Sequence, residues 1–469
     1  MSWLSTIPKR CAAWAGALLL STAALALAGC HTLPAINPDM APPGKTVRID
    51  GAHGPLSAAQ SRAILERLKQ SGKDTDIFER HLALEQALAA TPLVAGNKVR
   101  LLKDGPATYR AMFAAIGAAR DHINLETYIL EDDDVGQRFA DALIERQRAG
   151  VQVNLIYDSV GTLHTSKAFF ERLKASGIRL LEYNPVNPLT ARAGWDVNER
   201  DHRKLLVVDG RIALLGGINI SGVYSGGSSG PPSPQRNGEA LPWRDTDLQV
   251  EGPVVADFQR LFMDTWTSQH GAPLDPRNYF PKLAARGKEV VRAIGGSPDE
   301  PYSQIYATLI SAIDSAATEV LLTNAYFAPD PQLLATLKAA AARGVNVTLL
   351  LPSKTDSALI LWAGRSYYTE LLEGGVRIFE RHDALLHSKT ALIDGVWSTI
   401  GSTNLDWRSF LHNQELNAVV LGADFGVQMR AMFDADKAAS EPVTLEAWQR
   451  RPLGMRLKET FGRLWQYWL

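Results

Sequence analysis

Two segments of the chain repeat one pattern of residues that can do chemistry. Residues 202–219 and 387–404 both fit H-x-K-x4-D-x6-G-x2-N without a gap. A histidine followed by four specified residues at fixed spacing is rare by chance, and a second match in the same chain is far rarer. Each segment supplies an imidazole, an ammonium and a carboxamide. Two such sets around one ligand would suit a phosphodiester.

The two imidazoles can divide the work of a displacement at phosphorus. One, neutral, attacks phosphorus and forms a phosphohistidine. The other, protonated, gives its proton to the leaving alkoxide and then deprotonates the incoming acceptor. Histidine suits both tasks because its pKa lies near neutral pH. His202 and His387 are therefore the candidate catalysts, and the residues alone leave open which of them attacks.

Hydrogen-bond donors beside each histidine can stabilise the charge that grows on the non-bridging oxygens. The candidate donors are Lys204, Lys389, Asn219 and Asn404. Ser402 is a further candidate, and because its counterpart is Gly217 the two segments are not equal.

A carboxylate on the far ring nitrogen is needed to fix the tautomer and basicity of each imidazole. A predicted strand follows each histidine segment, and these strands carry Asp245 and Glu415. Asp247 lies on the same strand face as Asp245 and could replace it.

Each segment predicts a strand hairpin that positions these groups. Alternation along a strand places the His and Lys of H-x-K on one face. The apolar runs 205–208 and 390–393 are typical of strands, and the Asp-Gly after each is typical of a tight turn. The returning strand would bring the asparagine of each segment beside its histidine. We expect the turn residues Asp209 and Asp394 to have a structural role.

These motifs resemble the phospholipase D superfamily, whose mark is a duplicated H-x-K-x4-D. Residues 243–266 and 401–420 look like the cardiolipin synthase branch, and the resemblance covers about residues 98–455. It implies His202 as nucleophile and His387 as general acid and base, roles that the two could exchange. The implied reaction is a transphosphatidylation without metal or other cofactor. Phosphatidylglycerol would form a phosphatidyl-enzyme, and a second lipid alcohol would accept the phosphatidyl group.

Two other functions compete with this one. The first is hydrolysis by a phospholipase D or phosphodiesterase, with water as acceptor. The second is a lipid-binding scaffold without activity, which the intact His, Lys and Asn of both segments argue against. The usual bacterial cardiolipin synthase has two N-terminal membrane helices, whereas this sequence shows one apolar stretch that resembles a signal peptide. The acceptor therefore stays open.

The order of helical and strand-like segments predicts a duplicated α/β unit. Residues 107–130 and 306–329 each begin a helix–strand–helix–strand series, with Gly-bearing turns at Gly150 and Gly344. Helices that alternate with apolar strands imply parallel strands in a covered sheet. The predicted fold class is α/β, with two tandem phospholipase D-like domains, mixed central sheets and an active site at their pseudo-twofold interface.

The predicted organisation has five parts. They are a signal peptide (1–30), a tether with a helical extension (31–97), a first domain (98–290), a second domain (291–445) and a C-terminal amphipathic helix (446–469). Residues 225–238 have no counterpart in the second half, and their Gly, Ser and Pro content indicates a loop. A solvated insertion is favoured over a flap near the site.

The N-terminus predicts a lipid anchor. Lys9 and Arg10 precede an apolar stretch that ends Leu27-Ala28-Gly29-Cys30, similar to the lipobox of bacterial lipoproteins. We therefore expect lipidation of Cys30 and a position in the bacterial cell envelope, facing the periplasm. No Asp follows the cysteine, which slightly favours the outer over the inner membrane. The alternative is an uncleaved membrane helix with an incidental cysteine.

The C-terminal segment predicts a second membrane contact. Apolar side chains recur at helical spacing from Leu453 to Trp468, and five Lys and Arg residues lie between 450 and 463. This pattern fits an interfacial amphipathic helix. A helix packed on its own domain fits equally well.

Composition narrows the partners. The formal net charge is -1, so the chain has no net positive charge to attract polyanions. We therefore expect a phospholipid and a membrane as partners rather than nucleic acid. Both cysteines, Cys11 and Cys30, lie in the first thirty residues, so neither a disulfide framework nor a structural zinc site is expected beyond them.

Overall fold

A computed structural model describes residues 33, 47–71, 75–78, 80–88, 91–187, 195–227 and 241–468. It separates Met1–Ala35 from Ile36–Leu469, and all elements below belong to the second unit. Cys30 and residues 228–238 of the predicted loop lie outside the described residues.

The chain forms two similar halves. The first contains β3 (Leu93–Leu102), α4 (Gly105–Ala118), β4 (His122–Thr127), α5 (Asp134–Arg148), β5 (Gln152–Asp158), α6 (Lys167–Ala175), β6 (Arg179–Tyr183), β7 (Arg200–Asp201), β8 (Leu205–Val208), β9 (Ile212–Gly216), η4 (Gly222–Tyr224), β10 (Trp243–Arg244), β11 (Asp247–Glu251) and α7 (Val255–Ser268). The second contains β12 (Glu289–Gly296), α8 (Gln304–Asp314), β13 (Glu319–Thr323), α9 (Pro331–Ala342), β14 (Asn346–Pro352), α10 (Ala358–Arg365), α11 (Tyr368–Glu373), β15 (Arg377–Arg381), β16 (Leu385–Leu386), β17 (Thr390–Ile393), β18 (Trp397–Gly401), α12 (Trp407–Leu411), β19 (Asn413–Leu421) and α13 (Ala423–Ala438).

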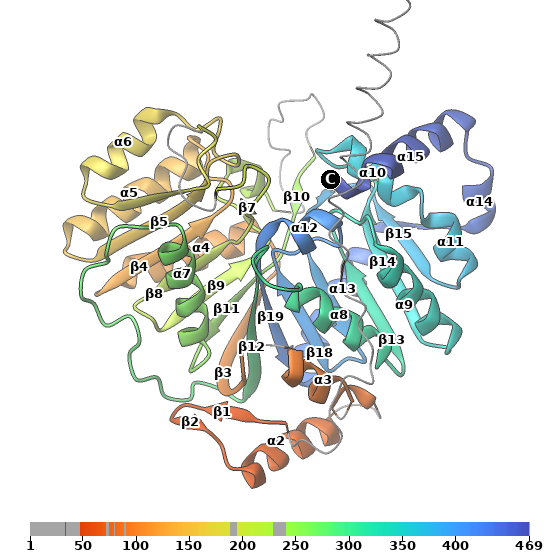
Figure 1. The fold of residues 1–469 in the computed structure, drawn as a ribbon, viewed down its shortest axis with the longest axis horizontal. Coiled ribbons are helices and arrows are strands. Elements are labelled where there is room, and N and C mark those ends of the chain that lie inside the picture. The colour runs from red at the N-terminus through yellow and green to blue at the C-terminus, as the bar shows by residue number, and fades with distance from the viewer. Residues whose placement is uncertain are drawn as a thin grey trace, which may run out of the picture. The chain divides into compact units, whose positions relative to one another are not determined.

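The sheets of the two halves join edge to edge (Figure 1). The strand order is β6-β5-β4-β8-β9-β11-β3 in the first half and β12-β19-β18-β17-β13-β14-β15 in the second. Starting from the antiparallel pair β3–β12, both halves show the same series outward. The three outermost strands of each series are parallel and the others antiparallel. The predicted α/β fold with mixed sheets and tandem related domains is confirmed.

Five of the helices that cover the sheets have a side-chain cap at their N-terminus. Side-chain oxygens of Asp104, Asp133, Ser166, Ser303 and Asp330 accept hydrogen bonds from the first turns of α4, α5, α6, α8 and α9. Such N-caps contribute about 1 kcal/mol each. Strands β4 and β13 are buried at every position, as expected for strands covered on both faces.

One buried cluster runs across the junction of the halves. It includes Phe258 and Phe262 of α7 together with Phe425 and Met429 of α13. These two helices follow the last strand of each half, so they occupy equivalent places. The halves therefore share one core, which fixes the catalytic segments relative to each other.

The predicted hairpins are present, and their turn residues have the predicted structural role. Asp209 and Asp394 have φ of 54° and 50°, a left-handed conformation that Asp tolerates. The carboxylate of Asp209 accepts from the backbone N–H groups of residues 120–122, and that of Asp394 from those of residues 317–319. Each turn thus ties the start of β4 or β13 to its hairpin.

The remaining described elements lie before and after the duplication in the chain. They are β1 (Ile49–Gly51), β2 (Gly54–Pro55), α2 (Ala58–Ser71), η2 (Asp76–Phe78), α3 (Arg80–Leu88), β20 (Ser440–Val443), α14 (Leu445–Gln449), α15 (Leu453–Trp465) and η5 (Gln466–Trp468). From α3, buried His81 contacts Ser311 (Nδ1 to Oγ, 3.0 Å) and buried Glu85 faces Arg292 at 3.4 Å.

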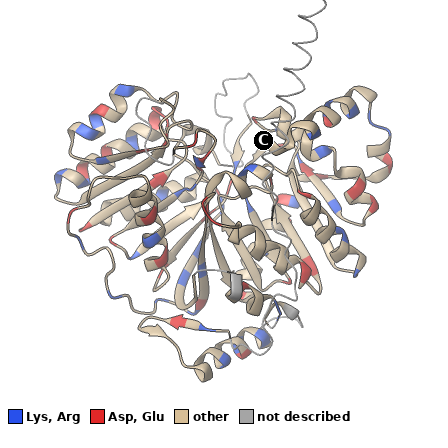
Figure 2. Cartoon of the chain, viewed as in Figure 1, with Lys and Arg blue, Asp and Glu red and all other residues tan. Residues whose placement is uncertain are grey.

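The C-terminal segment is two helices where one was predicted, because Pro452 separates α14 from α15. The predicted limits at 98, 291 and 446 fall inside β3, β12 and α14, and the division into those parts stays a prediction. In the described residues, no helix is both long and apolar enough to cross a membrane. Figure 2 shows acidic and basic residues interspersed along the ribbon of both halves.

Candidate active site

The two motif histidines line one cavity of about 270 Å³. Its lining includes residues of β7, β10 and α12. Its wall comes from both halves: Tyr128, Ile129, Arg200, His202, Asn219, Tyr224 and Trp243 from the first, and Tyr326, Asp356, Ser357, Ile360, His387, Asn404, Asp406, Arg408, Ser409 and Asn413 from the second. The predicted interface site is therefore formed as a single cavity.

His202 is held by Glu415 of the other half. Its Nδ1 lies 3.1 and 3.2 Å from the two carboxylate oxygens of Glu415. The Ser402 hydroxyl donates to the same carboxylate, and Asn413 donates to it at 3.3 Å. Because the carboxylate accepts, Nδ1 carries the hydrogen, and Nε2 is the ring nitrogen left for a ligand.

His387 is held in the same way by Asp245. Its Nδ1 lies 2.7 Å from Asp245 Oδ2, and the other carboxylate oxygen accepts from the Thr246 N–H at 2.7 Å. Tyr224 Oη lies 3.4 Å from the same ring nitrogen. Asp247 accepts instead from the Ile218 N–H at 3.1 Å. Of the two candidates, Asp245 is the partner of the histidine.

The histidine–carboxylate pairs cross between the halves because short strands are exchanged. β7, before His202, pairs with the start of β19, before Glu415. β10, before Asp245, pairs with β16, before His387. The exchange continues into the motifs: His202 N donates to Gln414 O at 2.9 Å, and His387 N donates to Arg244 O at 2.7 Å.

Burial controls the protonation of this cluster. Burial and then the charge of Lys204 lower the pKa of His202 to about 4, against the opposing effect of Glu415. Burial and then Lys389 lower the pKa of His387. Burial raises the pKa of Glu415, but His202, Lys204 and the Ser402 hydrogen bond outweigh it and hold that pKa at about 2. At neutral pH the unliganded site therefore holds a neutral His202 beside an ionised Glu415.

The motif lysines lie behind the histidines. Lys204 Nζ donates to His202 O at 2.5 Å. Lys389 Nζ donates to His387 O and lies 2.9 Å from His387 Nδ1. Burial lowers the pKa of Lys204 to about 7 and also lowers the pKa of Lys389. Neither lysine is among the residues that line the cavity of the histidines, so their contact with a ligand stays a prediction.

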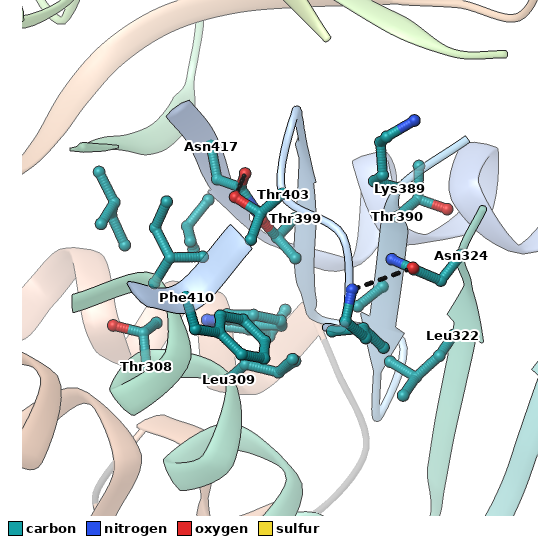
Figure 3. Close-up of a pocket in the computed structure, with 16 residues that line it drawn as sticks. Thr308, Leu309, Leu322, Asn324, Lys389, Thr390, Thr399, Thr403, Phe410 and Asn417 are labelled. Carbon is teal, nitrogen blue, oxygen red and sulfur yellow. Dashed lines mark hydrogen bonds between the residues drawn. The ribbon is translucent and has the colours of Figure 1, made fainter. Parts of the chain in front are cut away.

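A second, small cavity of about 30 Å³ lies beside Lys389 in the core of the second half. Figure 3 shows the Lys389 side chain extending away from Leu309, Leu322 and Phe410, while Asn324 accepts a hydrogen bond from Leu405 N at 3.0 Å. A space of this volume holds about one water molecule. It belongs to the packing behind the site and cannot take a lipid headgroup.

The asparagines lie as predicted, on the cavity wall with the histidines. Asn219 Oδ1 accepts from Ile129 N at 3.1 Å, which turns its amide group toward Tyr224. Ser402 differs from the expectation. Its hydroxyl hydrogen goes to Glu415 rather than to a ligand, so it orients the carboxylate. Its counterpart Gly217 leaves no room for a side chain, since a Cβ there would lie 2.3 Å from Asp245.

Comparison with known proteins finds the same pattern. A family model described as "Cardiolipin synthase, PLD-like domain" matches residues 112–225 and 309–437, one block in each half. The cardiolipin synthase of Geobacillus sp. (strain WCH70) is 34% identical over 386 residues, which are 82% of this chain and 74% of that protein. The major cardiolipin synthase of Bacillus subtilis (strain 168) is 32% identical over 372 residues, 78% of this chain and 74% of that protein.

The chain belongs to the cardiolipin synthase family. Its fold is also that of phosphatidylserine synthase from Haemophilus influenzae Rd KW20. That crystal structure superposes with a TM-score of 0.64 and 14% identity, over 83% of this chain and 100% of the other. At this identity the likeness shows the fold alone.

Sequence reasoning missed the aromatic part of this family member's site. The rings of Tyr128 and His202 pack edge to face, with their centroids 5.1 Å apart. The ring centroids of Trp243 and His387 are 5.2 Å apart. The rings of Tyr224 and Tyr326 also lie edge to face with His387, at centroid distances of 6.0 and 6.1 Å. One signal was present: Tyr128 and Tyr326 follow the buried strands β4 and β13, and ligands of α/β sheets bind beyond the carboxyl ends of strands.

Proposed function

We propose that this protein is a phosphatidyltransferase of the cardiolipin synthase type that works through a phosphohistidine. The observation that supports it best is the pair of imidazoles in one cavity, each backed by the carboxylate of the other half. One imidazole can form the covalent bond while the other moves the proton. Family membership makes a phospholipid the substrate.

In the first step, His202 Nε2 attacks the phosphorus of the donor lipid. A P–N bond forms and the bond from phosphorus to the headgroup oxygen breaks, while protonated His387 gives its proton to that oxygen. In the second step His387 takes the proton of an acceptor hydroxyl, whose oxygen attacks phosphorus and releases His202. The assignment of His202 as nucleophile rests on the family resemblance.

The bound substrate favours the protonated form of His387. A phosphodiester anion in the cavity favours the charged forms of nearby bases, so it raises the pKa of His387 toward the protonated state that the first step needs. The same anion favours the ammonium forms of Lys204 and Lys389. These groups, with Asn219 and Asn404, then donate to the non-bridging oxygens. The residues themselves supply every acid, base and nucleophile in this scheme.

Phosphatidylglycerol is the donor that we propose, with a second lipid alcohol as acceptor. The test is to incubate the purified protein with phosphatidylglycerol vesicles and identify the products by lipid mass spectrometry. Cardiolipin plus glycerol is the expected result. Phosphatidic acid plus glycerol would instead establish the alternative, hydrolysis with water as acceptor.

The histidine mechanism is tested in the same assay. His202→Ala should lower turnover about 10⁴-fold or more, as for other nucleophiles that act as part of a unit. His382→Ala is the matched control, because His382 is exposed and pairs with Glu441 outside the cavity. Full turnover by His202→Ala would refute the mechanism.

We further propose that lipidated Cys30 anchors the enzyme in the cell envelope, facing the periplasm, and that the C-terminal helix is a second membrane contact. The lipobox-like sequence supports the anchor. Loss of fatty-acid labelling in Cys30→Ser, measured in cells, is the expected result. Unchanged labelling would place any lipid elsewhere.

A further inference from the structure

Helix α15 turns its apolar face away from the protein. Leu453, Leu457, Phe461, Leu464 and Trp465 lie along one side of it and are between 48% and 75% exposed. Trp468 in η5 continues this side and is 53% exposed. A helix packed on its own domain buries such a face. The structure instead packs α15 on its own domain through its other side, so this apolar face is left exposed.

The opposite side of α15 holds the helix in place with small and polar residues. Gly462 lies against the backbone of α10, where a Cβ would come within 2.6 Å of Ala363 N. Buried Glu459 pairs with Arg451 at 2.8 Å. The helix is therefore fixed to the second half and leaves its apolar face free, which is the arrangement of an interfacial helix.

This helix is one element away from the catalytic cavity. α10, on which it packs, begins after Ser357 and carries Ile360, and both residues line the cavity. Figure 1 shows α15 and the C-terminus at the end of the molecule that also carries α12, β7 and β10. The N-terminal elements α2 and α3 lie at the opposite end.

The first half exposes apolar residues beside the same cavity. Leu163 is 59% exposed, in a loop whose Gly161 lies directly against the carbonyl of the cavity residue Tyr128. Val197 is 51% exposed, and its neighbour Asn198 accepts a hydrogen bond from the cavity residue Arg408 at 2.9 Å. Exposed apolar groups of both halves therefore lie on segments that contact residues of the cavity wall.

The residues around α15 carry an excess of positive charge, which indicates the kind of surface that the helix can bind. Residues 450–468 contain five Lys and Arg and one acidic residue, Glu459, which is buried in its ion pair. Basic and aromatic groups beside an exposed apolar face favour an anionic bilayer surface. Phosphatidylglycerol, the donor proposed above, is itself an anionic lipid.

We propose that the apolar face of α15, with Leu163 and Val197, docks on an anionic bilayer and turns the cavity toward it. The volume of the cavity supports this proposal, since about 270 Å³ is just below the roughly 300–1,000 Å³ of pockets that enclose a whole drug-sized ligand. A headgroup and its phosphate enter, while the acyl chains stay in the bilayer. The proposal rests on the proposed function for its substrate, but its docking step can be tested without turnover.

The first test reads the depth of a spin label. The full-length chain is first made with Ser in place of Cys11 and Cys30. Leu457→Cys, or Val427→Cys as the matched control, then supplies the one cysteine to which a nitroxide is attached. Val427 is 66% exposed on α13. On vesicles that contain phosphatidylglycerol, the label at 457 should become more accessible to oxygen and less accessible to a water-soluble nickel complex. The label at 427 should stay in water.

The second test separates docking from chemistry. Leu457→Ser with Phe461→Ser should lower transfer at limiting vesicle concentration about tenfold or more, because each change removes an apolar side chain that docking would bury in the bilayer. Transfer with monomeric dihexanoyl-phosphatidylglycerol should be unchanged. If the unmodified enzyme transfers nothing in either form while the label at 457 enters the bilayer, the proposed function fails and the docking proposal stands.

Two outcomes would overturn the docking proposal. In one, the label at 457 stays as accessible to the nickel complex as the label at 427. In the other, it is shielded without vesicles, in particles of twice the chain's mass, so that a second copy of the chain covers the helix.

Discussion

At the residue scale, each catalytic histidine is paired with a carboxylate of the other half, His202 with Glu415 and His387 with Asp245. The roles of the two carboxylates can therefore be tested separately. We predict that Glu415→Gln behaves like His202→Ala, and Asp245→Asn like His387→Ala, because each carboxylate holds the histidine of the other half. Either carboxylate change should lower turnover about 10²–10⁴-fold. The measurement uses phosphatidyl-p-nitrophenol, whose leaving group needs no proton. Asp245→Asn should still release a burst of p-nitrophenol, and Glu415→Gln should not.

Asp247→Asn is the control for this pair of variants. Burial, then Asp245, raises the pKa of Asp247 well above its ordinary value, which favours the neutral form. Its Oδ1 accepts from the Ile218 N–H at 3.1 Å, and the amide oxygen of Asn keeps that bond in a side chain of the same shape. Its burst and turnover should therefore stay close to those of the unmodified enzyme. The crossed arrangement is wrong if Glu415→Gln shares the kinetics of His387→Ala instead.

The sequence predicted the residues of this site better than their connections. The motif spacing located both histidines, and strand patterns located Asp245 and Glu415. The crossing could not be predicted, because it depends on two-residue strands that pair residues 200–201 with 413–414. Strands so short leave no periodic pattern in the sequence. The hydroxyl of Ser402 was assigned to a ligand because its partner, Glu415, meets it only across folded strands.

At the element scale, the seat of α15 on α10 depends on one glycine. We predict that Gly462→Ala lowers the free energy of unfolding by about 1–3 kcal/mol, because its Cβ would lie 2.6 Å from the backbone nitrogen of Ala363. The helix should also loosen. Urea unfolding measures the first effect, and faster proteolytic cleavage after Arg456 or Lys458 measures the second.

Gly454→Ala makes the same chemical change in the same helix, at a position where a Cβ meets nothing within 4 Å. It should leave stability unchanged or raise it by up to about 1 kcal/mol, through helix propensity alone. Equal effects of the two substitutions would show that α15 is not seated closely on α10.

Elements were predictable where a local pattern defines them. The Asp-Gly turns, the hairpins and the repeated helix–strand series followed from spacing. The outward face of α15 did not, because an amphipathic pattern shows that a helix has an apolar side without showing what covers it. That answer comes from the contacts of Gly462 and Glu459.

At the scale of the whole molecule, duplication predicted two related domains with a shared site, whereas the edge-to-edge union of the sheets through β3 and β12 needed the structure. The residue pattern of a strand does not predict which distant strand it pairs with. The union has a functional consequence, since it lets one chain supply both histidines, both carboxylates and the exchanged strands.

A site built within one chain cannot be repaired by mixing defective chains. We predict that separately purified His202→Ala and His387→Ala proteins make no cardiolipin when they are combined, because each folded chain keeps its own β7–β19 and β10–β16 pairs. Exchange would require the shared core around Phe258 and Phe425 to open, which native proteins rarely do without unfolding. Unmodified enzyme diluted into either variant calibrates the assay and should give activity in proportion to its amount. Recovery of transfer in the mixture would mean that halves of different chains form the site, and that the exchanged strands join chains as well as domains.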